Sequence, residues 1–549
     1  MGTPINQKPC VVETPQGFSV SYNNRFLYSK YAPSKLIVNK INGLEILTGT
    51  IFICNSPALC YGLPELLQKL PENCLVFLCE FDNNLHNLTE ESPIYNSVKN
   101  NESLFFPSVK DLYDLPIEIY NMASSGQYRR VISIDFSSGT QFIPDLYKKL
   151  EDACVNSVKT FWTNRLTLTK FGRQYSRNFF TNLKKLGNTT PINCYFNSVT
   201  KPVLIFGAGQ SVDLFFNKYN SRNINWNDYF ILCVDTILSS LISRNIIPDG
   251  VFVEEAQSII SKAFICRKYN VQLFTGLSSL PLLSQYFENS NISYFTTEYT
   301  KASFIDRLSH KGLLPSINSP FGSVGLTTVY YGLKFRKDNS IPVFVTGLDF
   351  SYSTGYTHGK GTLAHKTRLI NNNKLNPIEN YGAAFSPSSV KIIDKAGNIF
   401  ITTPTLAGYG NLFNNMFGRE KNLYDVSECG MKLSIPIINL INLTSIQNTN
   451  NNNKTNNKTE IKKSSFSKDF INDINKFLSD EKNDLLKLRS LLTEESSLAP
   501  EELKNEITKF AFEREYLYLH FPDGYTFQYN QSFLNRIRTE IDFFLKIFD

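Results

Sequence analysis

Residues 202–213 read PVLIFGAGQSVD, and this stretch decides the fold of the central part of the chain. The apolar run 202–206 predicts a buried strand, Gly207 and Gly209 predict a tight turn, and the residues after Ser211 predict a helix. A glycine turn at a helix N-terminus lets backbone amides approach an anion. The third glycine of a dinucleotide fingerprint is missing, and glycines also make structural turns, so this turn alone does not assign a function.

Two further apolar runs, residues 230–234 and 250–253, predict strands that each end in polar side chains. In an open parallel sheet the carboxyl ends of the strands face the ligand crevice. The spacing therefore predicts a Rossmann-like, mostly parallel sheet with a nucleotide-type ligand at its carboxyl edge. The polar residues at these two strand ends are Asp235, Thr236, Glu254, Glu255 and Gln257.

Two loops further along the chain offer more polar groups. The loop 318–328 begins with Asn318 and Ser319 and also contains Gly322 and Ser323; it suits a phosphate or a sugar, or is simply the capped start of a helix. The strand 342–347 is followed by Asp349, Tyr352 and a loop that holds Thr357 and His358. A loop histidine near a carboxylate can act as a general base, and a solvated loop histidine is the alternative for both His358 and His365.

The first part of the chain predicts a smaller α/β domain. Residues 50–54 and 75–81 read as strands around a short helix. Glu80 stands where a ribose-binding acid could lie, but the loop 55–58 has no glycine and Pro57 removes an amide, which favours a structural unit over a nucleotide site.

The remaining segments are helical or polar. Residues 145–190 have apolar residues at spacings of three and four, and residues 466–549 contain aromatic stripes that serve as core or, alternatively, dock a partner protein. The Asn-rich segment 448–460 is typical of a disordered linker. We therefore expect an N-terminal α/β domain (1–130), a helical connector (131–199), the central domain (200–445), a linker (446–465) and a helical C-terminal domain (466–549).

Composition limits the function classes. The chain has 549 residues, 42% of them hydrophobic, and its charge of +7 is not concentrated in a basic block, so we expect no nucleic-acid partner. It has no apolar run of membrane-spanning length and no secretion signal, so we expect a cytoplasmic protein. The ten cysteines form no Cys-x-x-Cys pair and the five histidines no His-x-x-x-His, which favours buried free thiols over a metal site.

A series of short motifs over roughly residues 200–432 resembles the motility-associated factor (Maf) flagellin glycosyltransferases. Gln210 replaces the proline of the family pattern, and Glu255 stands where the family usually has Asp. The matching blocks are Gly207–Asp213, Asp235-Thr236, Pro248-Asp249, Glu255-x-Gln257, Gly322-Ser323-Val324, Gly347–Tyr352, Thr357-His358 and Tyr424–Gly430.

The resemblance implies an activity, because the central domain of this family is similar to bacterial sialyltransferases. It implies transfer of a pseudaminic- or legionaminic-type nonulosonic acid from CMP to Ser or Thr hydroxyls of flagellin, with no further cofactor and no metal. His358 would be the base, oriented by Asp349, and Tyr352 would help to stabilise the leaving phosphate. The donor-binding residues would be Gly207, Gly209, Gln210, Ser211, Asp235, Thr236, Glu255, Gln257, Asn318, Ser319, Gly322, Ser323 and Thr357.

The sequence is also compatible with two other functions. The same central domain is similar to archaeal 6-hydroxymethylpterin diphosphokinases, which use ATP and magnesium; Asp235, Glu254, Glu255 and Asp349 would then supply carboxylates. A non-enzymatic flagellin-binding assembly factor, working through its C-terminal helices, is the third interpretation.

Overall fold

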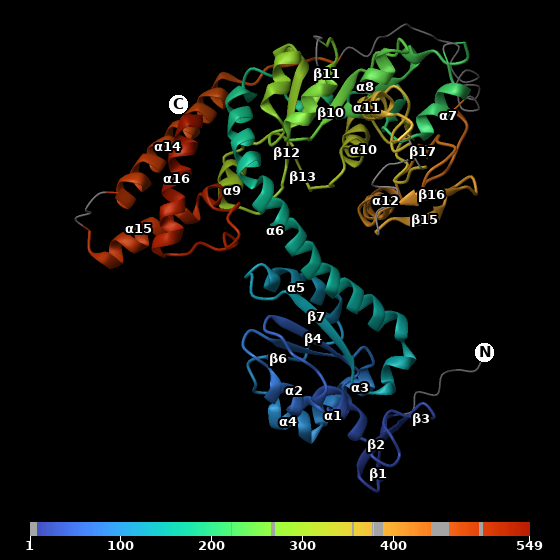
Figure 1. The fold of residues 1–549 in the computed structure, drawn as a ribbon, viewed down its shortest axis with the longest axis vertical. Coiled ribbons are helices and arrows are strands. Elements are labelled where there is room, and N and C mark those ends of the chain that lie inside the picture. The colour runs from blue at the N-terminus through green and yellow to red at the C-terminus, as the bar shows by residue number, and fades with distance from the viewer. Residues whose placement is uncertain are drawn as a thin grey trace. The chain divides into compact units, whose positions relative to one another are not determined.

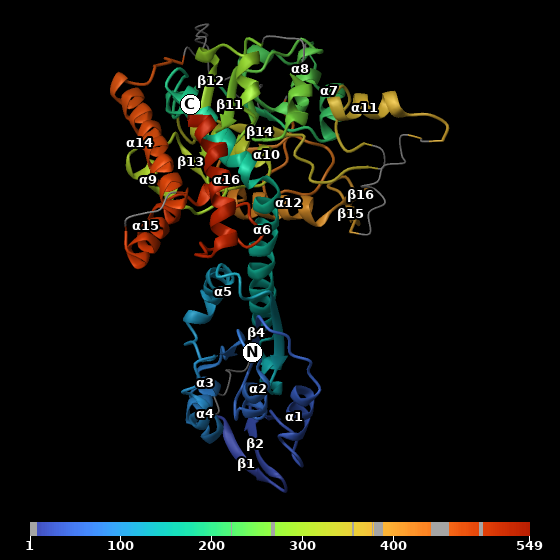
Figure 2. The same cartoon turned by 60° about the vertical axis from the view of Figure 1, so that its left-hand side comes forward.

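The computed structural model describes residues 8–220, 222–264, 269–353, 356–375, 377, 388–440, 461–493 and 498–548. Cys266 and residues 446–460 of the predicted linker lie outside these ranges. The chain forms two compact units (Figures 1 and 2). The first comprises Met1–Gly172 and Tyr518–Gln528, and the second comprises Arg173–Leu517 and Tyr529–Asp549.

The first unit is built on a four-stranded parallel sheet in the order β6-β5-β4-β7. The predicted strands are β4 (Thr50–Asn55) and β5 (Leu75–Cys79). The structure adds β6 (Leu104–Phe105) and β7 (Arg130–Asp135), which begins at residue 130, the expected end of this domain. A separate antiparallel sheet contains β1 (Cys10–Thr14), β2 (Gly17–Tyr22) and β3 (Arg25–Phe26).

Helices cover both faces of this parallel sheet because alternate side chains of its strands are apolar. Phe52 and Val76 pack against α1 (Lys35–Asn42) and α2 (Leu63–Lys69), while Ile51 and Phe77 pack against α5 (Leu115–Ala123) and the beginning of α6 (Pro144–Leu186). The other helices of the unit are α3 (Asn83–Glu91) and α4 (Pro93–Val98).

Glu80, the candidate ribose-binding acid of the first unit, is fully buried. Its carboxylate accepts hydrogen bonds from Ser56 Oγ (2.9 Å), Tyr147 OH (2.7 Å) and Asp82 N (3.0 Å), and burial raises its pKa. Glu80 therefore links three segments of its own unit.

The second unit contains an eight-stranded parallel sheet in the order β13-β12-β11-β10-β9-β8-β14-β17. This confirms the mixed α/β class with a mostly parallel sheet. The helix α10 (Val324–Phe335) covers one face, packing on Ile205 and Leu232, whereas Phe206 contacts Phe215 of α7 (Ser211–Lys218) on the other face. The strands are β8 (Val203–Phe206), β9 (Phe230–Val234), β10 (Gly250–Val253), β11 (Gln272–Gly276), β12 (Ile292–Thr297), β13 (Ile317–Asn318), β14 (Val343–Thr346) and β17 (Leu423–Asp425).

Further elements surround this sheet. They are α8 (Asp235–Ile242), α9 (Ser303–His310), α11 (Leu363–Asn371), α12 (Pro404–Phe417) and the antiparallel hairpin of β15 (Val390–Ile393) and β16 (Ile399–Thr402). The chain ends in α14 (Lys468–Thr493), α15 (Pro500–Phe512) and α16 (Gln531–Phe548), which confirms the helical C-terminal region.

The aromatic and aliphatic stripes of the C-terminal helices form core. Phe477 and Leu485 of α14 and Phe544 of α16 are buried, and Phe544 lies 6.3 Å, between ring centroids, from Phe180 of α6. A buried ionic group joins α14 to the chain after α15, where Arg514 pairs with Glu481 and Asp484.

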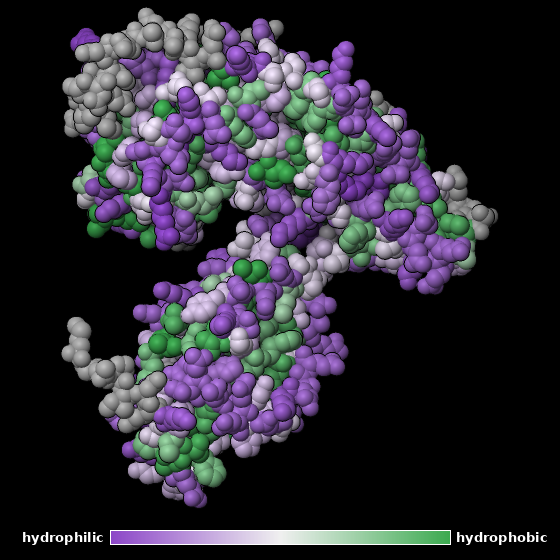
Figure 3. Space-filling model, turned by 180° about the vertical axis from the view of Figure 1, so that it is seen from behind, coloured by the Kyte–Doolittle hydropathy of each residue, from purple (hydrophilic) through white to green (hydrophobic). Residues whose placement is uncertain are grey.

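On the face drawn in Figure 3, hydrophilic side chains dominate and hydrophobic ones form small separate patches. Among the described residues, no helix is long and apolar enough to cross a membrane.

Candidate functional site

The carboxyl edge of the eight-stranded sheet has its topological switch point between β8 and β14. The strands β9 to β13 follow one another on one side of β8, while β14 and β17 lie on the other side. In open parallel sheets, ligands bind outside the carboxyl ends of the strands at such a point. The turns that follow β8 and β14 are therefore the expected position of a ligand site.

Gly207 and Gly209 allow the turns after β8 and β14 to lie against each other. A Cβ on Gly207 would come within 2.6 Å of the carbonyl carbon of Gly347, and one on Gly209 would come within 2.5 Å of Asp349 Cγ. Gly347 has a φ of +74° and would itself meet Gly207 O at 2.6 Å. These glycines are thus required for close backbone packing, while contact with a ligand stays a prediction.

Asp349 joins the two turns through Ser211, the first residue of α7. Its carboxylate accepts hydrogen bonds from Ser211 N (2.8 Å) and from Ser211 Oγ, and both residues are buried. Ser211 Oγ also accepts a hydrogen bond from Gly347 N (3.1 Å). A carboxylate therefore already occupies the anion-binding end of α7, where the sequence predicts a phosphate.

A buried ion pair lies behind Asp349. Lys395, from the turn between β15 and β16, pairs with Asp425 at the end of β17. Burial raises the pKa of Asp349 to about 6, and Asp425 adds to this rise, while the hydrogen bonds from Ser211 and the charge of Lys395 oppose it. Met431 N donates to Asp349 O (2.8 Å), so the segment after β17 closes over the same aspartate.

The carboxyl ends of β9 and β10 bring several acidic residues near one another. Asp235 is buried and accepts hydrogen bonds from Thr236 N (2.5 Å) and Thr236 Oγ1 (2.8 Å). Burial raises its pKa to about 6, and Glu255 and Glu254 contribute to the same rise. Glu255 accepts a hydrogen bond from the exposed Gln257 through its backbone N (2.8 Å).

Glu254 connects the strand ends to α10. Its carboxylate accepts hydrogen bonds from Thr297 Oγ1 at the end of β12 (2.7 Å) and from Thr327 Oγ1 in α10 (2.6 Å). Asn318 donates to Thr297 Oγ1 (3.3 Å) and to Ser319 O (2.9 Å). Asn318 and Ser319 therefore lie with Glu254 along one edge, and Glu254 is a more connected residue than the sequence indicated.

The N-terminus of α10 is the third helix start on this edge. Gly322, with a φ of +70°, and Ser323 precede it, and a Cβ on Gly325 would approach Leu348, which follows β14, to 2.6 Å. The side chain of Ser323, the N-cap residue, makes no capping hydrogen bond to the first turn of α10. Because Asp349 and Asp235 already occupy the starts of α7 and α8, the geometry favours α10 for an added anion.

The loop that follows Tyr352 is anchored on the glycine turn. Tyr352 is buried and pairs with Ile401 of β16 through backbone hydrogen bonds (2.8 Å each way). Ser353 donates from N (2.9 Å) and Oγ (2.7 Å) to Gln210 Oε1, and Gly359 N donates to Ala208 O (2.9 Å). Gln210 therefore holds this loop.

His358 lies in this loop beside Thr357 and Arg368. Its Nδ1 lies 3.0 Å from Thr357 Oγ1, to which Arg368 of α11 also donates a hydrogen bond. Burial, and secondly the charge of Arg368, lower the pKa of His358 to about 4. The carboxylate of Asp349 bonds Ser211 and not this imidazole, so the structure does not show the predicted Asp349–His358 pair. His365 stacks on Tyr356, with ring centroids 5.9 Å apart.

Three amide side chains of α6 hold the loops of this edge, and the sequence analysis missed them. Gln174 and Asn178 donate to Ala256 O (2.6 and 3.2 Å), and Asn182 donates to Leu277 O (2.8 Å) and Ser279 O (2.9 Å). Their spacing of four residues on an otherwise apolar helix face is the signal that could have found them.

No metal-binding group is evident on this edge. Among the residues that the structure describes, no three His, Cys, Asp or Glu side chains are grouped so that they could hold a metal ion. Asp349 lies with Lys395 and Asp425, whereas Asp235 lies with Glu254 and Glu255, so these carboxylates belong to two different groups.

Three comparisons relate the chain to known proteins. A family model described as "6-hydroxymethylpterin diphosphokinase MptE-like" matches residues 177–355. An uncharacterized protein of Treponema pallidum (strain Nichols) is 28% identical over 566 aligned positions, which cover 98% of this chain and 95% of that protein. The solved structure of the MAf glycosyltransferase from Magnetospirillum magneticum AMB-1 aligns with a TM-score of 0.55 and 13% identity, covering 99% of this chain and 91% of that one.

These comparisons bear on the fold and on the resemblance drawn from the motifs. At 13% identity the structural likeness shows a shared fold along nearly the whole chain. The resemblance to the Maf family is therefore supported at the level of the fold. The MptE-like match covers the strands from β8 to β14 and the start of α10, and it ends before His358 and Arg368.

Gly209→Ala tests whether the glycine turn needs close packing. The added methyl overlaps the Asp349 carboxylate, so we expect a loss of about 1–3 kcal/mol in stability, the usual cost of overpacking. Gly408→Ala in α12 is the matched control, because nothing lies within 4 Å of its Cβ position, and it should be neutral or stabilising. Urea unfolding of both variants measures the difference; equal stabilities would contradict the packing role.

Asp235→Asn tests the electrostatics of the edge. Since the pKa of Asp235 is raised from 3.8 to about 6, the folded protein binds this proton more tightly than the unfolded chain. The stability that protonated Asp235 adds to the folded protein is fully present below pH 3.8. It is lost as the pH rises through 6, which lowers the free energy of unfolding by up to about 3 kcal/mol. Relative to the unsubstituted protein, the melting temperature of Asp235→Asn should therefore increase from pH 4 to pH 7.

Asp338 is the control, because its pKa is shifted in the opposite direction. Hydrogen bonds from Ser340 Oγ and N lower the pKa of the exposed Asp338, so the stability that it contributes is lost as the pH falls. Asp338→Asn should therefore lower the melting temperature slightly at pH 7, and less at pH 4. A pH-independent difference for Asp235→Asn would show that its charge is not buried as described.

Proposed function

We propose that the chain is a glycosyltransferase that transfers a nonulosonic acid of the pseudaminic or legionaminic type from CMP to Ser or Thr hydroxyls of flagellin. The observation that carries the proposal is the fold correspondence with a MAf glycosyltransferase over 99% of the chain. The motif blocks quoted from residues 207–430 support the same family.

The geometry of the carboxyl edge is compatible with this chemistry. The N-terminus of α10, with Gly322 and Ser323, offers amides for the single phosphate of a CMP-sugar. Arg368, held beside Thr357 and His358, is a cation that can stabilise the phosphate as the bond to the sugar breaks. These groups would act on charge that develops on the leaving CMP.

His358 would take the proton of the acceptor hydroxyl. With its pKa lowered to about 4, its imidazole is neutral at physiological pH and its ring nitrogen can accept a hydrogen bond from the incoming Ser or Thr. Asp349 would contribute by fixing the turns rather than by contacting the histidine.

The alternative is a diphosphokinase that uses ATP and magnesium, and the MptE-like match over residues 177–355 favours it. In this reaction the metal would be held largely by the phosphates, because the acidic residues of the edge form two separate groups. Whether the chain binds a cytidine or an adenine nucleotide distinguishes the two functions directly.

Donor binding and flagellin mass test the proposal together. Calorimetry should show that the full chain binds CMP at least tenfold more tightly than ATP, and that magnesium has little effect on CMP. Intact flagellin from a deletion strain should lose one or more nonulosonic-acid units in mass. Preferential magnesium-dependent ATP binding with unchanged flagellin mass would reject the transferase in favour of the kinase.

The pH dependence of transfer tests His358 as the base. Because its pKa lies near 4, the rate should show no acid limb from this group above about pH 5. His358→Ala should lower kcat by about 10²–10⁴-fold, the typical contribution of a general base. His365→Ala is the control and should change kcat little. Unchanged transfer by His358→Ala would remove this residue as the base.

A further inference from the structure

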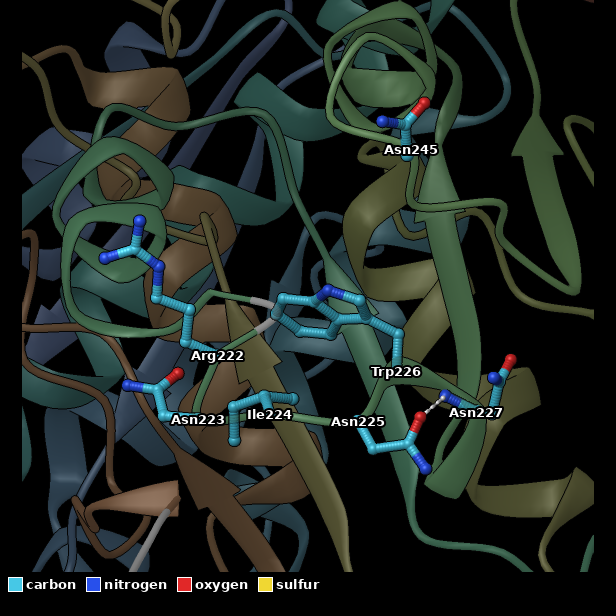
Figure 4. A pocket seen from close by; sticks show the side chains of 7 residues that line it. All are labelled: Arg222, Asn223, Ile224, Asn225, Trp226, Asn227 and Asn245. Atoms are coloured by element: carbon cyan, nitrogen blue, oxygen red, sulfur yellow. Dashed lines mark hydrogen bonds between the residues drawn. The ribbon is translucent and has the colours of Figure 1, made fainter.

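A hollow with a volume of about 560 Å³ lies in the second unit, away from the carboxyl edge (Figure 4). Trp226 and Asn227 belong to the short helical turn before β9, and Asn245 belongs to the turn after α8, which leads into β10. The hollow is thus at the amino ends of the strands. The five residues of β9 separate it from Asp235 by about 16 Å. Its lining residues are Arg222, Asn223, Ile224, Asn225, Trp226, Asn227 and Asn245.

Two of the asparagines fix the shape of this loop. Asn223 accepts a hydrogen bond from Asn220 N (2.8 Å) and donates to Lys218 O (2.8 Å). Asn225 accepts from Asn227 N (3.3 Å) and donates to Asp228 (3.0 Å). The hydrogen-bonding groups of these two side chains therefore have partners within the loop.

The remaining side chains present unused polar groups around an aromatic ring. Figure 4 shows the half-buried indole of Trp226 in the middle of the group, with Arg222 to one side and Asn245 to the other. The indole packs on Phe215, with ring centroids 6.3 Å apart, which fixes its position. Within the described residues, the side chains of Arg222, Trp226, Asn227 and Asn245 have no hydrogen-bond partner.

This combination of groups is suited to an acidic sugar. An indole offers a flat apolar face for the C–H groups of a pyranose, together with a single N–H donor. Carboxamides can donate to and accept from hydroxyl and acetamido groups. The guanidinium of Arg222 matches a carboxylate in geometry and charge.

We propose that this hollow is a second carbohydrate site that binds a carboxylated pyranose, with Trp226 under the ring and Arg222 on the carboxylate. The assignment of its ligand rests on the proposed function, since a nonulosonic acid is the sugar that would be attached to flagellin. Because the site is distant from the carboxyl edge, it would hold a sugar already transferred. It would thereby keep a partly modified acceptor on the enzyme.

Tryptophan fluorescence provides the test, because Trp162 and Trp226 are the two tryptophans of the chain. Trp162→Phe leaves Trp226 as the reporter, and titration with free N-acetylneuraminic acid should change its emission saturably. N-acetylglucosamine, which lacks the carboxylate, should bind at least fivefold more weakly. Equal affinity for the two sugars would overturn the assignment to an acidic ligand.

Calorimetry on variants completes the test. Arg222→Gln should weaken binding of N-acetylneuraminic acid at least tenfold, and Trp226→Phe should weaken it by a similar factor. Arg419→Gln, at another exposed arginine of the same unit, should have no effect. Absence of saturable binding, unchanged binding by Trp226→Phe, or displacement of the sugar by CMP would each overturn the second site.

A transfer assay with flagellin separates this proposal from the proposed function. If Arg222→Gln reduces the number of sugars added per flagellin but not the rate of the first addition, both proposals are supported. Sugar binding at Trp226 without any transfer would reject the glycosyltransferase and leave the site in place. Transfer without sugar binding at Trp226 would reject the second site alone.

Discussion

The contact between Asp349 and Ser211 is the interaction on which the candidate site depends. It joins the chain after β14 to the first turn of α7, across the switch point of the sheet. Two buried groups of opposite polarity satisfy each other there, so neither is left unpaired in a low-dielectric surrounding. Gly209 allows the aspartate to approach, and Gly430 and Met431 close over it.

Because of this contact, the glycine turn after β8 does not offer a free helix N-terminus to a phosphate. A strand, a glycine turn and a helix start are the parts of a phosphate site, yet a carboxylate of the protein already lies at the helix end. The same is true of α8, whose own Asp235 bonds its first-turn amide. Both carboxyl groups have a pKa raised to about 6, so the edge holds acidic groups that titrate just below neutral pH. The start of α10, whose N-cap Ser323 makes no side-chain capping bond, remains the better place for an added anion.

The loop that follows Tyr352 packs on the glycine turn and carries the candidate catalytic groups. Gln210 and Ala208 hold Ser353 and Gly359 on either side of the segment that carries Thr357 and His358. Arg368 reaches the same threonine from α11. A cation, a neutral imidazole and a helix N-terminus are therefore arranged around one edge of one sheet. On the other side of that edge, α6 fixes the loops after β10 and β11 through its amide side chains.

The sequence by itself determined the class of fold. Apolar runs such as 202–206 and 230–234 are buried on both faces, so they could be recognised as parallel strands without the structure. It also placed Asp235 and Asp349 at strand ends. Only the tertiary structure decided which partners these side chains have, because Ser211 and Asp349 are 138 residues apart and a strand-end position does not specify a neighbour. For the same reason the short strand β6, the link from Glu254 to Thr327 and the hollow around Trp226 could not be predicted, since each depends on which distant segments the packing brings together.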